Sequence, residues 1–268
     1  TPGHSSAASD VYKRQLGHKV TIYDKGWRPS GRLAYRQTED GSMFSIGSVN
    51  MDGSRNWMDR FQWDLGNSAK PFKNFLDELS KDQEVNYNTR IVGVKEDAQG
   101  VLLWGSSDSQ EVQFNHSRVI VAVPIEQATR LLEEGVFSGE SAPYWVAWGP
   151  GHEGSDSLPE GWSIRNVGNG TIELRLDPNS SEEHINRTKD EMASLIPTKA
   201  GFSPVGWSSH LWRYGRPISG PARVVHHGRI AFIGDAFGTP LGTIGAALDS
   251  AARAVADLHL MRGWNDET

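Results

Sequence analysis

The residues with the clearest chemical potential lie near the C-terminus, where an apolar run ends in a Gly-Asp pair. Arg229–Ile233 has the pattern of a buried strand, and Gly234-Asp235 follows it directly. A loop through Thr239–Thr243 (TPLGT) then leads into an alanine-rich helix predicted over Ile244–Met261. A helix N-terminus presents free N–H groups and the positive end of the helix dipole. This order of elements predicts an anion-facing site, with a plain strand-to-helix crossover of a sheet as the alternative.

A second acidic residue closes a predicted strand near the N-terminus. Lys19–Lys25 is KVTIYDK, and its β-branched and aromatic residues predict a strand that ends at Asp24 and Lys25. In dinucleotide-binding α/β folds, a carboxylate at this place accepts hydrogen bonds from ribose hydroxyls. Many surface strands also end in an acid, so this position alone is weak evidence.

The loop that follows is basic. Gly26–Arg36 is GWRPSGRLAYR, and its Ser30–Leu33 segment suits backbone and guanidinium contacts to a pyrophosphate. A solvated basic loop is the open alternative. Phe44–Asn50 then predicts a short strand with a glycine, Gly47, where close backbone approach is possible, and Gly47 is one of the candidate cofactor-binding residues.

His210 is the best polar candidate for contact with a small-molecule substrate. In the run WSSHLWRYGRP, Trp212 could form a stacking wall and Arg213 an anion clamp. A structural histidine with satisfied hydrogen bonds is the alternative for His210. The His226-His227 pair lacks identifiable partner ligands, so it predicts a solvated turn and no metal site.

The elements that must position these residues follow an α/β pattern. Apolar residues at helical spacing predict an amphipathic helix over Pro71–Leu79. Beyond it, the pattern predicts a three-stranded meander, a strand buried on both faces, and a helix. These occupy Tyr87–Val94, Gly100–Trp104, Glu111–Phe114, Arg118–Pro124 and Ile125–Glu134.

Residues 140–220 change character. They are rich in Trp, Gly, Ser and Pro, and they predict several short strands with one helix near Glu182–Leu195. We interpret this region as a substrate-side sheet inserted between parts of a nucleotide-binding domain.

The amino-acid composition argues for a globular protein and excludes several classes of function. The 268 residues are 37% hydrophobic, with 29 Gly and 10 Trp, which is typical of a globular protein. The absence of cysteine excludes disulfides, thiolate metal sites and a catalytic thiol, and it fits a reducing cytoplasm. A net charge of −6 argues against a nucleic-acid partner. No apolar run approaches the roughly 18 residues of a membrane span.

The first residues have an unusual origin. Ser5–Gln15 (SSAASDVYKRQ) matches one reading frame of a transposase sequencing adapter. We therefore expect residues 1–15 to be adapter-derived, with a natural disordered arm as the alternative. A glycine-rich phosphate loop belongs about twenty residues before Asp24. This placement predicts that the first βα unit is missing.

Several segments resemble one protein family. The run IYDKGWRPSGRLAYR resembles the second strand and arginine loop of renalase-like flavoproteins, members of the FAD-dependent amine oxidase superfamily. VIVAVPIEQATRLL and WSSHLWRYGRP are similar to later parts of that family. RIAFIGDAFGTPLGTIGAALDSAARAVADL resembles its C-terminal flavin-binding segment. These matches follow the family order over nearly all of residues 16–260.

The resemblance implies FAD as the cofactor and a role for individual residues. Asp24, next to Lys25, would hold the adenosine ribose, and Arg32 with the Gly31 backbone would face the pyrophosphate. Ile91 would reach the adenine through its backbone. Asp235 would bind the ribityl chain, with Gly234 permitting close approach. The last helix would begin beneath the flavin at Thr243, Ile244, Gly245 and Ala246.

The implied reaction is hydride transfer from a small reduced substrate to the flavin, which O2 then reoxidises. In the renalase-like branch the donor is an isomer of reduced nicotinamide dinucleotide, and in the amine oxidase branch it is an amine. The segment Phe44–Met51 departs from the family pattern, because Ser45, Ile46 and Val49 replace polar positions. Two alternatives remain open: a flavin- or nucleotide-binding protein without oxidase turnover, and a truncated chain without function.

The predicted fold class is α/β, a Rossmann-like FAD-binding domain with an inserted sheet-and-helix substrate domain. The FAD-binding part would comprise residues 16–65, 91–135 and 223–262. Residues 66–90 would form a helical substrate-side segment, and residues 136–222 the substrate domain. The sequence leaves the oligomeric state open.

Overall fold

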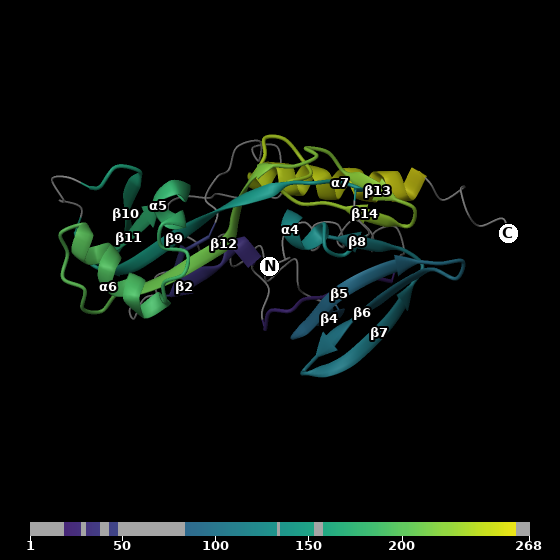
Figure 1. The fold of residues 1–268 in the computed structure, drawn as a ribbon, viewed down its shortest axis with the longest axis horizontal. Helices are drawn as coiled ribbons and strands as arrows, with labels where there is room; N and C mark the ends of the chain where they lie inside the picture. The colour runs from purple at the N-terminus through teal and green to yellow at the C-terminus, as the bar shows by residue number, and fades with distance from the viewer. Residues whose placement is uncertain are drawn as a thin grey trace.

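The computed structural model describes residues 19–27, 31–37, 43–47, 84–132, 135–152 and 158–260. The predicted adapter-derived segment and the predicted helix at Pro71–Leu79 lie outside these residues. Figure 1 shows two lobes. One holds a four-stranded sheet with helices α5 (Pro178–Glu182) and α6 (Lys189–Lys199), and the other holds helix α7 (Ile244–Leu260). The long strands β9 (Glu140–Pro150) and β12 (Ser208–Ser219) extend from the first lobe toward the second.

Two separate groups of strands form the part of the chain that the sequence predicts to bind a nucleotide. Strand β1 (Thr21–Tyr23) pairs in parallel with β4 (Glu84–Asn86). Strand β8 (Val119–Val121) pairs in parallel with β14 (Ile230–Phe232), which also pairs with β13 (Val225–His227). The strands predicted at Lys19–Lys25, Arg118–Pro124 and Arg229–Ile233 are therefore confirmed.

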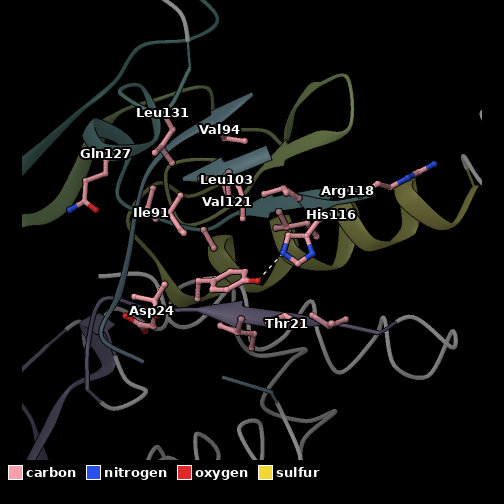
Figure 2. Close-up of a pocket in the computed structure, with 18 of the residues that line it drawn as sticks. Thr21, Asp24, Ile91, Val94, Leu103, His116, Arg118, Val121, Gln127 and Leu131 are labelled. Atoms are coloured by element: carbon pink, nitrogen blue, oxygen red, sulfur yellow. Dashed lines mark hydrogen bonds between the residues drawn. The ribbon is translucent and has the colours of Figure 1, made fainter. Parts of the chain in front are cut away.

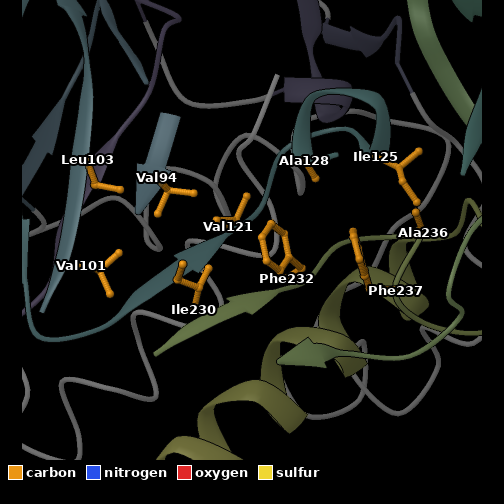
Figure 3. Packing of buried hydrophobic residues seen from close by; sticks show 10 residues of the cluster. All are labelled: Val94, Val101, Leu103, Val121, Ile125, Ala128, Ile230, Phe232, Ala236 and Phe237. Atoms are coloured by element: carbon orange, nitrogen blue, oxygen red, sulfur yellow. The ribbon is translucent and has the colours of Figure 1, made fainter. Parts of the chain in front are cut away.

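The predicted meander is also confirmed. Strands β5 (Thr89–Glu96), β6 (Val101–Ser107) and β7 (Gln110–His116) form an antiparallel sheet in chain order. Its inner face packs on β8, β14 and the short helix α4 (Ile125–Ala128). Figure 3 shows Phe232 and Phe237 at the centre of this core, where apolar side chains from these elements meet.

Helix α7 (Ile244–Leu260) covers the strands β8 and β14 (Figure 1). Its buried face repeats at helical spacing through Ile244, Leu248, Ala251 and Ala254, which pack against Ala231 and Ile233. Small alanine side chains let the helix lie close to the sheet. The predicted helix is confirmed through Leu260, and α4 is shorter than its predicted range of Ile125–Glu134.

The second lobe is built on long strands, where the sequence predicted short ones. Its sheet has the order β10-β11-β9-β12. The strands span Glu140–Pro150 (β9), Trp162–Gly168 (β10), Thr171–Leu176 (β11) and Ser208–Ser219 (β12). One face packs Trp145, Ile172 and Leu174 against Met192 and Ile196 of α6.

The single helix predicted near Glu182–Leu195 is wrong, because the structure has two helices there. Helix α5 (Pro178–Glu182) is followed by turns, and α6 (Lys189–Lys199) begins afresh after Thr188. Thr188 and Glu191 form a capping box, in which each side chain accepts from the backbone N–H of the other residue. This Thr-x-x-Glu signal is visible in the sequence and marks a helix start.

The opposite face of the same sheet carries a short hairpin. Strand β2 (Tyr35–Gln37) follows the 3-10 turn η1 (Gly31–Leu33) and pairs with β3 (Met43–Ser45). Phe44 and Ile46 are buried against Val146 and Trp212 of the large sheet. In the described part of the chain, no helix is long and apolar enough to span a membrane.

Candidate functional site

A cavity of about 880 Å³ separates the two groups of parallel strands. Strand β1 forms one side and β8 the other, while the meander, α4 and α7 close the remaining walls (Figure 2). Cavities of this size hold cofactor-sized ligands. In parallel α/β sheets, ligands bind beyond the carboxyl ends of the strands. Here that end is marked by Asp24 after β1 and Val121 to Val123 at the end of β8.

Asp24 is the buried acidic group of this cavity, with only 5% of its surface exposed. Its Oδ1 accepts a hydrogen bond from the Gly26 backbone N–H at 2.7 Å. Burial raises the pKa of Asp24, and the Gly26 hydrogen bond opposes that rise. This is the one hydrogen bond that the described residues give to its side chain. Oδ2 is therefore available to a ligand hydroxyl.

The rest of the described lining is mostly apolar, with several basic and uncharged polar residues. Ile91 of β5 and the exposed Lys25 lie on the same cavity as Asp24, so the structure brings together the three residues predicted for the adenosine end. Among the lining residues that the structure describes, Asp24 is the only acidic one, whereas five carry a basic side chain: Lys19, Lys25, Arg90, Arg118 and Arg130. This balance favours a ligand that carries negative charge.

The second predicted part of the site lies where η1 meets the Gly-Asp turn. Arg32 is largely buried and donates hydrogen bonds to the Asp235 carboxylate and to the Gly215 carbonyl. Burial lowers the pKa of Arg32, while nearby Tyr144 and Glu126 oppose that shift. The sequence assigned Arg32 and Asp235 to different parts of a cofactor, and the structure pairs them with each other.

Two glycines shape this junction. Gly31 has φ +49° and Gly234 has φ +132°, backbone conformations that side-chain-bearing residues rarely adopt. Gly47 is constrained by space, because a Cβ on it would lie 1.7 Å from the Arg32 carbonyl oxygen. Gly47 thus packs directly against the backbone of Arg32, the residue that pairs with Asp235, and its role in cofactor binding stays a prediction.

The start of α7 is capped by its own threonine. The Thr243 hydroxyl accepts from the Ala246 N–H at 3.0 Å and donates to the Pro240 carbonyl at 2.8 Å. The cap therefore occupies one of the amides that the sequence assigned to the cofactor. Ile244 and Gly245 come first in the helix, where N–H groups have no acceptor in a preceding turn.

Three consecutive carbonyls, beginning at the last residue of β3, are held by the large sheet. The Ser45 carbonyl accepts from Arg165 at 2.7 Å, and the Ile46 carbonyl accepts from the Trp212 indole N–H at 2.8 Å. The Gly47 carbonyl accepts from Arg175 at 2.7 Å. We call this arrangement the carbonyl clamp. It fixes the backbone of Gly47, and through it the position of η1.

The carbonyl clamp depends on one buried carboxylate, Glu173 of β11, which is 1% exposed. It binds Arg165 at 2.8 Å and Arg175 at 2.5 Å. Burial lowers the pKa of Arg175, but the Glu173 carboxylate outweighs this and raises it above its ordinary value. The Arg175 guanidinium also lies 5.7 Å from the centre of the Tyr144 ring.

The three residues predicted for catalysis separate in the structure. His210 and Trp212 lie together on one face of β12, with ring centres 4.6 Å apart. Trp212 is buried and belongs to the carbonyl clamp, so the described contacts give it a positioning role. Arg213 is exposed, and as the next residue along the strand it points to the opposite face.

His210 has an unusual electrostatic environment. Burial, together with the positive charges of Lys189 and Arg36, lowers the pKa of His210 to about 4. Its imidazole is therefore neutral at pH 7. Arg36 also lies over the Trp148 ring, 5.6 Å from its centre. The surroundings of His210 are thus aromatic and positively charged.

The carbonyl clamp is the part of the site that sequence reasoning missed. Glu173 and Arg175 alternate with apolar residues in TIELRL, which places them on one face of β11. That spacing is visible in the sequence. It is equally typical of a solvent-exposed strand face, and only the packing of the hairpin makes this face interior.

No known family model and no curated protein matches the sequence. In fold, the chain is similar to a putrescine oxidase triple mutant made to redesign cofactor binding. That match has a TM-score of 0.67 and 14% identity, and covers 96% of this chain and 97% of the other.

Two further structures show the same fold. CabE, an aromatic hydroxylase from angucycline biosynthesis, matches with a TM-score of 0.61 and 14% identity over 96% of this chain and 60% of that chain. BexE, studied for oxidation during BE-7585A biosynthesis, matches with a TM-score of 0.59, 15% identity and the same coverage. These likenesses confirm the predicted α/β fold class with a two-domain architecture.

Replacing Glu173 by Gln tests the carbonyl clamp. The substitution keeps the side-chain shape but leaves two arginines without their counter-charge, so we expect the free energy of unfolding to fall by about 3 kcal/mol. Urea unfolding followed by tryptophan fluorescence measures it. The same change at the exposed Glu111 of β7 should cost less than about 0.5 kcal/mol. Equal effects at both positions would contradict a structural role for Glu173.

The lowered pKa of His210 predicts a pH dependence of stability. An unfolded histidine has a pKa of about 6.5, so the unfolded chain takes up a proton as the pH falls from there towards 4, and the folded chain does not. Stability should therefore decrease through this window. His210→Gln should show a smaller drop in melting temperature between pH 7 and pH 5 than the unaltered chain. His152→Gln, at an exposed position, is the control. An unchanged drop in His210→Gln would refute the assignment.

Proposed function

We propose that the chain is an FAD-dependent oxidoreductase that takes a hydride from a small reduced substrate. One observation carries the proposal. A buried carboxylate, Asp24, stands at the carboxyl end of a parallel strand, on a cavity whose other charged groups are basic. This is the arrangement that a dinucleotide needs for its ribose and its phosphates. The fold shared with putrescine oxidase supports the same cofactor.

The residues present fit the cofactor in three places. Asp24 has a free oxygen for a ribose hydroxyl, with Lys25 and the Ile91 backbone beside it on the same cavity. The first amides of α7, at Ile244 and Gly245, would face the negative edge of the reduced ring. Asp235 would bind the ribityl chain, while Gly31 and Arg32 would contact the pyrophosphate. Because Arg32 already pairs with Asp235, its guanidinium would lie close to both the ribityl chain and the pyrophosphate.

When bound, FAD supplies the hydride acceptor, and O2 is the proposed final oxidant. The protein itself positions the reacting groups and excludes water from them. The carbonyl clamp holds Gly47 and η1 against the Gly-Asp turn. The aromatic rings of Trp212 and Tyr144 beside His210 exclude water from that side of the site. A neutral His210 can accept or donate one hydrogen bond to a substrate without adding charge.

The electrostatics at His210 discriminate between the two substrate classes. Burial is the largest cause of the low pKa of His210, and the positive charges of Lys189 and Arg36 add to it. These charges also disfavour a cationic amine and favour a donor that carries phosphate. We therefore propose an isomer of reduced nicotinamide dinucleotide, the donor of the renalase-like branch, over the amine that the name putrescine oxidase indicates.

A second candidate is a flavin-binding protein without oxidase turnover. Ile46 favours it, because this residue is fully buried where the resembling family carries a polar group. Anaerobic mixing of the FAD-loaded chain with dihydronicotinamide isomers, or with putrescine, separates the possibilities. Bleaching of the flavin by the dinucleotide supports the proposed substrate, and bleaching by putrescine alone overturns it. Reduction by dithionite alone favours the second candidate.

Replacing Asp24 by Ala should weaken FAD binding by about 10- to 100-fold. A hydrogen bond to a charged group contributes about 1.5–3 kcal/mol, which corresponds to that range. Titration of protein into FAD, followed by quenching of flavin fluorescence, measures the dissociation constant. Asp190→Ala, at an exposed position at the start of α6, is the matched control. Equal affinities for the two variants would remove Asp24 from the site.

The binding should also depend on pH. Burial raises the pKa of Asp24, so its carboxylate is lost earlier on acidification than that of an ordinary aspartate. FAD affinity should fall as the pH drops through this raised pKa, and Asp24→Asn should be insensitive over the same range. The fluorescence titration repeated at intervals from pH 7 down to pH 4 provides the comparison. A matching decline in Asp24→Asn would place the titrating group elsewhere.

A further inference from the structure

Glu126 of α4 carries a buried carboxylate oxygen that lacks a partner. Its Oε2 atom is hidden from solvent and has no hydrogen bond to any residue that the structure describes. An oxygen of this kind costs free energy, because folding removes the water that would otherwise donate to it. Buried polar groups in native proteins nearly always have a partner, so Oε2 calls for a donor from outside the chain.

Packing places α4 against the Gly-Asp turn. Ile125, the residue before Glu126, lies in one core cluster with Ala236, the residue after Asp235 (Figure 3). Both border Gly220, where a Cβ would lie 2.8 Å from the Ala236 carbonyl oxygen and 3.2 Å from Ile125 Cδ1. Glu126 and Asp235 are therefore each one position away from the same packing contact.

Glu126 also acts electrostatically on Arg32, the buried arginine of this junction. Burial lowers the pKa of Arg32, and Glu126 is one of the two groups that oppose the shift. The hydrogen bonds of the Arg32 guanidinium to described residues go elsewhere, to Asp235 and to the Gly215 carbonyl. Two carboxylates thus lie near one guanidinium. Asp235 is bound to it, and Glu126 keeps its free oxygen.

This arrangement suits a ligand in which hydroxyl groups adjoin an anionic group. A carboxylate accepts strongly from a hydroxyl group and repels a phosphate, whereas a guanidinium binds the phosphate. The ribityl chain of FAD has this combination, because its hydroxyl groups directly precede the pyrophosphate. Glu126 therefore fits the ribityl part of the cofactor, and Arg32 fits the adjoining phosphate.

We propose that Glu126 is a further cofactor-binding residue, and that its Oε2 accepts a hydrogen bond from a ribityl hydroxyl group. It acts beside Asp235, whose carboxylate is already engaged by Arg32. The bound hydroxyl group supplies the donor that the chain itself does not provide. This inference rests on the proposed FAD cofactor and adds a second carboxylate to its site.

Glu126→Gln and Glu126→Ala separate the hydrogen bond from the charge. Both remove one negative charge, but only glutamine retains an oxygen that accepts from a hydroxyl group. We expect FAD to bind Glu126→Ala about two- to tenfold more weakly than Glu126→Gln, the range for a hydrogen bond between neutral groups. Quenching of flavin fluorescence measures both dissociation constants. Glu111→Gln and Glu111→Ala, at an exposed position of β7, should bind FAD equally well.

An FAD analogue whose linking chain carries no hydroxyl groups tests the contact itself. With this analogue the two Glu126 variants should bind with about equal affinity, because neither side chain has a donor to accept from. The same ratio with FAD and with the analogue would trace the loss to altered packing and overturn the inference. Equal affinities of the two variants for FAD would also overturn it.

Unfolding of the cofactor-free chain gives a readout that does not involve FAD. Glu126→Gln should shift the melting temperature by less than about 2 °C, because Oε2 has no described partner to lose. A drop as large as that of Glu173→Gln would make Glu126 a structural counter-charge and overturn the inference, with the proposed cofactor unaffected. An unaltered chain that binds no FAD would overturn the proposed function and this inference with it.

Discussion

The organisation of this protein rests on one carboxylate placed between two guanidinium groups in the interior. Glu173 lies at 2.8 Å from Arg165 and 2.5 Å from Arg175, and almost none of its surface reaches solvent. Charges are costly to bury unless they are paired and hydrogen-bonded. Here the remaining arginine donors reach the carbonyls of Ser45 and Gly47. The cluster thus fixes a backbone segment that belongs to the other half of the site.

This constraint propagates along the chain to the Gly-Asp turn. Because Gly47 lacks a side chain, it fits against the Arg32 carbonyl, and Arg32 in turn binds Asp235 and the Gly215 carbonyl. Directed polar contacts, as well as packing, therefore connect the large sheet with the part of the chain that is predicted to bind a nucleotide. The cavity lies between β1 and β8. The junction thus fixes how the two parts of the site lie relative to each other. The charges of the cavity lining determine which ligand the site favours.

Local patterns predicted much of this architecture. The apolar strands and the alanine-rich helix were predicted correctly because the spacing of apolar residues depends only on the element itself and on the face that it buries. Asp24 and Asp235 were found because each directly follows such a strand. The carbonyl clamp was not predictable, since Glu173, Arg175 and Trp212 act on a segment more than 120 positions away in the chain. The break between α5 and α6 was predictable from the Thr188 and Glu191 pair, but the spacing of apolar residues alone does not indicate it.

The central claim is that the cavity and the Gly-Asp junction together hold FAD. The most direct measurement is a visible absorption spectrum of the purified chain, incubated with FAD and then separated from free cofactor by gel filtration. The account predicts that the absorption bands of oxidised flavin elute with the folded protein. A colourless protein with an intact circular dichroism spectrum would contradict it.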